Sequence, residues 1–149
     1  MLLNLNIDPE DHSSCAISYN EHEYWLQAIW KGYVDPAEAM HGAQAYLQQA
    51  ANKRCAYLLN DNSRLQGPWF DSLDWLLDVW APEAARLGLR YVAHIVQADT
   101  HRDIFSGRNF DKVPFEVQVF QERADAIEWL QWMRDSNLPR TSGMVAVSQ

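Results

Sequence analysis

The stretch CAYLLNDNSRLQGPWFDS, residues 55–72, decides the fold class. Its first part, Cys55–Leu59, is apolar without alternation, which is typical of a strand covered on both faces. The polar run Asn60–Ser63 then predicts that the strand ends and that a loop continues to Ser72. A strand covered on both faces belongs to the centre of a layered sheet, so this stretch predicts an α/β domain.

Upstream of this strand, the sequence predicts a β-hairpin followed by a helix. Two β-like runs, Cys15–Tyr19 and Tyr24–Trp30, flank a short polar turn. The helix begins after Asp35, which can cap free amides, and Glu38 stands at the capping-box position. Apolar residues at helical spacing carry this helix to about Ala51.

Downstream of the loop, helical and strand patterns alternate. A second helix is predicted from about Asp71, with a break or kink at Pro82 and an end at Gly88. The apolar run Tyr91–Val96 predicts another buried strand, and the alternating run Phe115–Phe120 predicts a strand with one wet face.

A short helix at 100–106 at most, and a last helix at Arg123–Asp135, complete the pattern. Strands that alternate with helices imply parallel pairing, and the hairpin adds an antiparallel pair. We therefore expect a mixed sheet of about five strands in one domain at 15–135. A lead-in at 1–14 would precede the domain, and a loose tail at 136–149 would follow it.

Composition and charge exclude several classes of function. The 149 residues contain 12 Lys and Arg against 20 Asp and Glu, a formal net charge of −8, which disfavours nucleic acid and anionic membrane surfaces as partners. No signal peptide and no apolar run long enough to insert in a membrane is present, so we predict a cytoplasmic protein. Cys15 and Cys55 are then free thiols, unless neighbouring strands join them in a disulfide.

The sequence carries no recognisable catalytic signature. The five His show no spacing typical of a metal site, and the motifs of nucleophile elbows, phosphate loops and dinucleotide sites are missing. We therefore expect no enzyme activity, no metal and no cofactor. His94, in an apolar strand, is either a core imidazole with satisfied nitrogens or a functional group.

The candidate site is the 60–72 loop, because ligands of open α/β sheets bind at the carboxyl ends of the strands. Its polar residues either cap the turn or bind a ligand or partner. Aromatic rings around the second helix either cover the sheet or form a partner surface or an apolar ligand pocket. The candidate binding residues are Asn60, Asp61, Asn62, Ser63, Trp69 and Trp75.

The chain resembles the STAS fold family, and in particular the SpoIIAA-like proteins related to bacterial anti-sigma factor antagonists. The residues that carry the resemblance lie between Cys15 and Met133; among them are Trp30-Lys31-Gly32, Leu59-Asn60-Asp61-Asn62, Gly67-Pro68-Trp69 and Ala93-His94-Ile95-Val96. The resemblance implies helices packed mainly on one face of the sheet. It also implies a regulatory or binding module.

In the antagonists a partner kinase phosphorylates a Ser or Thr at the start of the helix after the third strand. By position this residue is Ser72, although the Asp-Ser-Ser-Gly run of the antagonists is absent here. Without the resemblance, Ser72 and Asp71 have a second interpretation as helix caps.

Three functional hypotheses follow. The first is a noncatalytic interaction module that binds a protein partner or a second copy of itself through the 60–72 loop and second helix. The second is a small-molecule binding protein that holds a nucleotide or an apolar metabolite between this loop and the Trp cluster. The third, an enzyme using Asp61 with His94 or His101, has the weakest support, since these groups are scattered along the sequence.

Overall fold

A computed structural model describes residues 1–97 and 113–137. Six strands form one mixed sheet in the order β1-β2-β3-β4-β5-β6, within a single α/β domain. The strands are β1 (Leu2–Ile7), β2 (Ser14–Asn20), β3 (Trp25–Tyr33), β4 (Tyr57–Gln66), β5 (Tyr91–Ile95) and β6 (Glu116–Phe120). The helix predicted at 100–106 and most of the predicted tail lie outside the described residues.

The predicted mixed sheet is confirmed, with one strand more than the five expected. β1 to β3 are antiparallel neighbours, and β3 to β6 are parallel. The hairpin predicted from the two β-like runs is β2–β3. The additional strand is β1, which lies in the stretch expected to be a lead-in and pairs with β2 as an edge strand.

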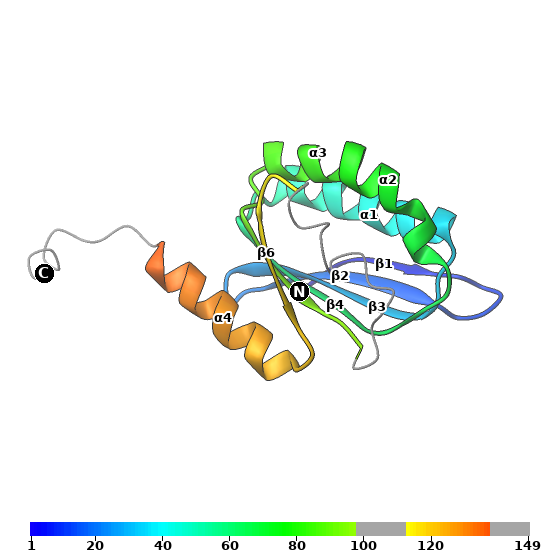
Figure 1. Cartoon of the computed structure of the whole chain (residues 1–149), viewed down its shortest axis with the longest axis horizontal. Coiled ribbons are helices and arrows are strands. Elements are labelled where there is room, and N and C mark those ends of the chain that lie inside the picture. The colour runs from blue at the N-terminus through cyan, green and yellow to red at the C-terminus, as the bar shows by residue number, and fades with distance from the viewer. Residues whose placement is uncertain (98–112, 138–149) are drawn as a thin grey trace, which may run out of the picture.

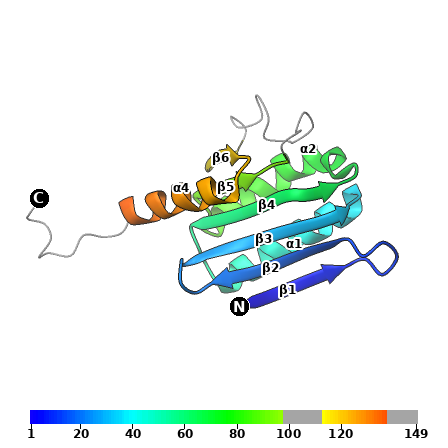
Figure 2. The same cartoon turned by 90° about the horizontal axis from the view of Figure 1, so that it is seen from below.

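Helices cover one face of the sheet fully and the other in part (Figures 1 and 2). α1 (Pro36–Asn52) and a helical segment of four parts lie on one face, and α4 (Arg123–Ser136) lies on the other, against β4 to β6. The segment consists of η1 (Trp69–Ser72), α2 (Leu73–Trp75), the π-helical turn η2 (Leu76–Trp80) and α3 (Ala81–Arg86). Among the described residues, no helix has both the length and the apolar character needed to cross a bilayer.

Alternation along the strands sends neighbouring side chains to opposite cores. In β4, Leu58 packs on the side of α1 and α3, whereas Leu59 packs on the side of α4. Val92 and Ala93 divide in the same way in β5. This double burial is the physical reason why these strands are apolar without alternation in the sequence.

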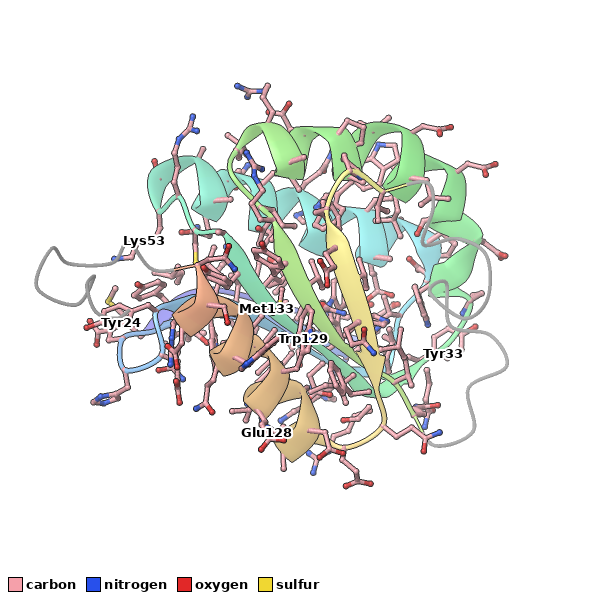
Figure 3. The ribbon with its side chains drawn as sticks, turned by 60° about the vertical axis from the view of Figure 1, so that its left-hand side comes forward. Tyr24, Tyr33, Lys53, Glu128, Trp129 and Met133 are labelled. Carbon is pink, nitrogen blue, oxygen red and sulfur yellow. The ribbon has the colours of Figure 1, made fainter. Side chains whose placement is uncertain are left out.

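α4 is held on its face of the sheet by buried apolar contacts and, at its C-terminal end, by an ion pair with Glu23. Trp129 on α4 packs against Phe120 of β6, with ring centroids 5.9 Å apart. The Arg134 guanidinium donates to the Glu23 carboxylate at 2.7 Å and to the Glu23 carbonyl at 2.8 Å. Figure 3 shows that this end of the sheet, near Tyr24, lies opposite the end that carries Tyr33.

Both cysteines are free thiols. Cys15 is buried in the core below α1, and burial raises the pKa of its thiol to about 12. Burial also raises the pKa of the Cys55 thiol. Both side chains therefore remain protonated at neutral pH and act as small apolar groups.

The prediction that the strand beginning at Cys55 stops at Leu59 and that Asn60–Ser63 form a loop was wrong. β4 runs on to Gln66, because it pairs in parallel with β3 as far as Tyr33. The register shifts between Ile29 and Lys31, which pair with Asp61 and Arg64, so that β4 carries one extra residue there. Asn60 and Asp61, which favour turns locally, are here held in the strand by β3 on one side and β5 on the other, and beyond Asp61 β4 pairs with β3 alone.

α1 begins where the sequence predicts. The Asp35 side chain accepts a hydrogen bond from the Glu38 backbone at 2.8 Å, and the Glu38 carboxylate accepts from the Asp35 backbone at 3.2 Å. This reciprocal capping box satisfies two of the amides that the first helical turn leaves unpaired.

Replacing Asp35 with Ala removes the cap and should lower the free energy of unfolding by about 1 kcal/mol. Urea unfolding followed by circular dichroism measures this change. The matched control is Asp78→Ala, at an exposed carboxylate on η2, which should stay within about 0.5 kcal/mol of the wild type. Equal effects of the two substitutions would contradict a capping role.

Candidate ligand-binding site

A cavity of about 90 Å³ lies between the sheet and the layer formed by α1 and the helical segment. Its walls come from β3, β4 and β5 below and from α1, η2 and α3 above, with Phe115 next to β6 at one side. The lining includes no charged side chain among the described residues. Several lining residues, among them Trp69 and Leu76, are only half-buried.

Parallel pairing of β3, β4 and β5 aligns the polar floor of the cavity. Asn60 stands opposite Ala28 on one side and opposite His94 on the other. Residues opposite one another across parallel strands share a face. Trp30, two residues after Ala28, and Asn62, two residues after Asn60, therefore also reach the cavity.

The floor is a chain of hydrogen bonds centred on Asn60. The indole Nε1 of Trp30 donates to Asn60 Oδ1 at 3.1 Å. Asn60 Nδ2 lies 3.0 Å from Asn62 Oδ1 and 3.0 Å from His94 Nδ1. Because an indole N–H can only donate, Asn60 must present its oxygen to Trp30 and its NH₂ group to the other two. His94 Nδ1 then accepts, which leaves the imidazole proton on Nε2.

Burial makes this network costly to disrupt. His94 is 1% exposed and Asn62 is 5% exposed. A buried polar group without its partner loses hydration that nothing replaces. The network therefore fixes the orientation of each polar side chain around the cavity.

Aromatic rings and aliphatic side chains together form the remaining wall. Trp80 on η2 donates from Nε1 to the Ala43 carbonyl of α1 at 3.0 Å. Its ring also contacts Tyr46, with centroids 5.5 Å apart, and Phe115, edge-on at 6.1 Å. These contacts fasten the π-helical turn to α1. Single π-helical turns within helices frequently occur at functional sites.

The six-membered ring of Trp30 lies against α1 at Gly42. A Cβ added to Gly42 would come within 2.4 Å of Trp30 Cη2, much closer than atoms can approach. Glycine is thus required here because the ring occupies the place of a side chain.

The predicted site residues divide between the two faces of the sheet. Asn60, Asn62 and Trp69 line the cavity, as the second hypothesis expected of the loop and Trp cluster. Asp61 points to the opposite face, where its Oδ2 accepts from the Arg123 guanidinium of α4 at 3.1 Å. Asp61 Oδ1 accepts from the Ser63 backbone at 2.9 Å, and the Ser63 side chain is exposed.

The remaining two predicted residues lie in the helical segment. Trp75 on α2 is half-buried and is not among the residues that line the cavity. Ser72 is 5% exposed, and its Oγ donates to the Trp69 carbonyl at 2.6 Å. Ser72 thus caps a turn in this conformation, and its phosphorylation, which would require the turn to open, stays a prediction.

Sequence reasoning did not identify Trp30, Tyr46 and Gly42 as part of a site. It also treated His94 more as a core residue than as a site residue, and His94 is both. His94 pairs with Asn60 directly, and Trp30 lies two residues after Ala28, which pairs with Asn60 on the other side, but these relations can be seen only once the parallel register is known.

Three carboxylates outside the cavity come close enough to hold a cation. Oxygen atoms of Asp8, Asp11 and Glu38 lie within 4.8 Å of one another, near the start of α1. Desolvation by burial raises the pKa of Glu38, and Ser13 Oγ donates to its carboxylate at 2.9 Å. Exposed acidic groups commonly gather without a metal, and we assign no metal site here.

The fold is similar to that of an uncharacterised protein of the DUF3478 family from Shewanella loihica PV-4, which has a SpoIIAA-like fold. The two chains are 18% identical and superpose with a TM-score of 0.55 over 84% of this chain and 98% of the other. No family model and no curated protein matches the chain. The likeness confirms a SpoIIAA-like, or STAS-like, fold.

The contact between Trp30 and Gly42 gives a test of the cavity wall. Gly42→Ala should lower the free energy of unfolding by roughly 1–3 kcal/mol, because the ring must shift to admit the methyl group. Helix propensity alone would give the opposite sign. The control is Gln44→Ala, at an exposed position of the same helix, measured by the same urea unfolding. A stabilised Gly42→Ala variant would contradict the close packing.

Proposed function

We propose that this protein is a noncatalytic binding protein whose cavity holds a small, uncharged and largely apolar molecule. The observation that carries the proposal is an aromatic cavity with a buried, internally hydrogen-bonded polar floor. Ligand sites of proteins are typically concave and apolar, with a few polar groups that orient the ligand.

Both the size and the chemistry of the cavity narrow the ligand class. A volume of about 90 Å³ is of the same order as the ~150 Å³ cavity known to hold benzene. A nucleotide, the other ligand considered from the sequence, would bring charged phosphates to a lining without a charged side chain among the described residues. The cavity therefore favours the apolar metabolite over the nucleotide.

Binding rather than catalysis is also what the polar groups support. The described polar side chains at the cavity are two amides, an imidazole, indoles and the phenol of Tyr46, and Asn60 is engaged at both its oxygen and its nitrogen. The enzyme hypothesis used Asp61 with His94 or His101. Asp61 faces the side of the sheet away from His94 and is paired with Arg123, and His101 lies outside the described residues. We therefore propose no reaction.

The test compares toluene and cyclohexanone as ligands of the wild type and of two variants in which a leucine replaces an alanine. Ala43→Leu adds bulk to a residue that lines the cavity, and Ala51→Leu adds the same bulk to an exposed residue of the same helix. At ten times Kd a ligand stabilises by about 1.4 kcal/mol, or roughly 3–6 °C in the unfolding midpoint. We expect this rise in the wild type and in Ala51→Leu only.

Tryptophan emission should change with the same concentration dependence, because three Trp residues line the cavity. Native mass spectrometry of the purified protein would detect a ligand that remains bound through purification. No thermal shift, no change in emission and no bound mass with either compound would contradict the proposal.

A second candidate function is self-association through the half of the sheet that α4 leaves uncovered (Figure 2). On that face the edge strand β1 exposes three apolar side chains, Leu2, Leu5 and Ile7, at 58%, 47% and 54%. Tyr33 at the end of β3 is 54% exposed. An exposed edge strand with a continuous apolar face is suited to pairing with a second copy of itself.

Leu5→Lys should therefore weaken a homodimer at least tenfold, as measured by sedimentation velocity over a concentration series. The matched control is Val79→Lys, since Val79 is 51% exposed on η2, in the layer where the sequence predicted the partner face. A dimer broken by Val79→Lys and not by Leu5→Lys would place the interface on the helical segment instead. A wild type that stays monomeric throughout would contradict self-association.

A further inference from the structure

Asn62 is a residue of the cavity floor whose side chain has a hydrogen-bond donor without an acceptor among the described residues. Its side chain is 5% exposed and lines the cavity. Its Oδ1 accepts from Asn60 Nδ2 at 3.0 Å. Its Nδ2 finds no acceptor among the residues that the structure describes.

The amide of Asn62 cannot turn over to remove this imbalance. Trp30 donates to Asn60 Oδ1, so Asn60 can offer Asn62 only its NH₂ group. Asn62 must accept this hydrogen bond with its oxygen, so its own NH₂ group remains available as a donor. Asn4 Oδ1 and Asn6 Nδ2 also have no hydrogen-bond partner, but these two atoms are fully buried. Asn62 Nδ2 is not one of the fully buried atoms without a partner, so it retains accessible surface. An open donor on a cavity wall can be satisfied by whatever fills the cavity.

We infer that Asn62 Nδ2 donates a hydrogen bond to an acceptor oxygen of the ligand, and that the ligand is an uncharged carbonyl compound with a compact apolar body. This inference rests on the binding function proposed above and specifies its ligand. The apolar body contacts the aromatic wall of Trp30, Trp69 and Trp80, and the oxygen meets the floor.

A charged acceptor fits this site less well than a neutral one. On binding, a carboxylate would lose its hydration and enter a cavity whose lining has no cationic side chain among the described residues. A single amide donor does not replace the hydration that a carboxylate loses, because a buried ion needs a counter-charge. A ketone, ester or amide oxygen needs only the one donor that Asn62 supplies.

The test uses a pair of ligands that differ only at the acceptor. Cyclohexanone carries a carbonyl oxygen, and methylenecyclohexane carries a CH₂ group in the same place. Each is added to the ¹⁵N-labelled full chain, and the side-chain NH₂ resonance of Asn62 is followed by NMR. This resonance is assigned through its absence from the spectrum of Asn62→Asp.

Both ligands should bind, and only cyclohexanone should move the Asn62 amide protons to lower field. Asn62→Leu should weaken cyclohexanone binding roughly three- to tenfold, the range for one neutral hydrogen bond, and change methylenecyclohexane binding less than about twofold. Asn52→Leu, at an exposed residue at the end of α1, is the control and should leave both affinities unchanged. If Asn62→Leu does not fold, the wild-type spectra decide alone.

The outcomes separate this inference from the proposed function. If both ligands bind and shift the Asn62 amide protons equally, or not at all, the inference is wrong. The apolar cavity then remains a binding site. Binding of cyclohexanecarboxylate as tight as that of cyclohexanone would overturn the uncharged ligand class. Failure of both neutral ligands to bind would overturn the proposed function, and the inference with it.

Discussion

The one-way hydrogen bond from the Trp30 indole to Asn60 is the constraint on which the rest of the site depends. An indole N–H has no acceptor capacity, so it sets the direction of the Asn60 amide. Asn60 in turn sets the direction of Asn62 and the tautomer of His94. Trp30 keeps this place because Gly42 lets its ring lie against α1. A glycine on a helix thus determines which polar atoms face the cavity.

β4 serves two layers of the molecule at once. Asn60 and Asn62 face the cavity below α1, while Asp61 between them faces α4 and pairs with Arg123. Substitutions in this short run therefore have different consequences. Changes at the amides alter the cavity, whereas a change at Asp61 alters the seating of α4. The apolar strip on β1 is separate from both, so ligand binding and self-association can be tested independently.

Much of the fold follows from local patterns, and the site follows from them only in part. The capping box at Asp35, the β2–β3 hairpin and the doubly apolar strands are each encoded within a few residues, and each is found where expected. Asn60 and Asn62 were predicted as binding residues in a loop after the strand, whereas they lie within β4 itself. Turn propensity at 60–63 was overridden by pairing with β3, which no local pattern reveals.

The sequence by itself determined the α/β class and most element positions, because periodicity and capping act over a few residues. Only the tertiary structure decided that Trp30, Asn60 and His94 meet, since these residues are far apart in the chain and come together through the parallel register of three strands. It also decided that Asp61 lies on the opposite face of the sheet, and that the Asn62 NH₂ group remains available as a hydrogen-bond donor. Those outcomes depend on which face each side chain takes, and a face is defined only when the strands are paired.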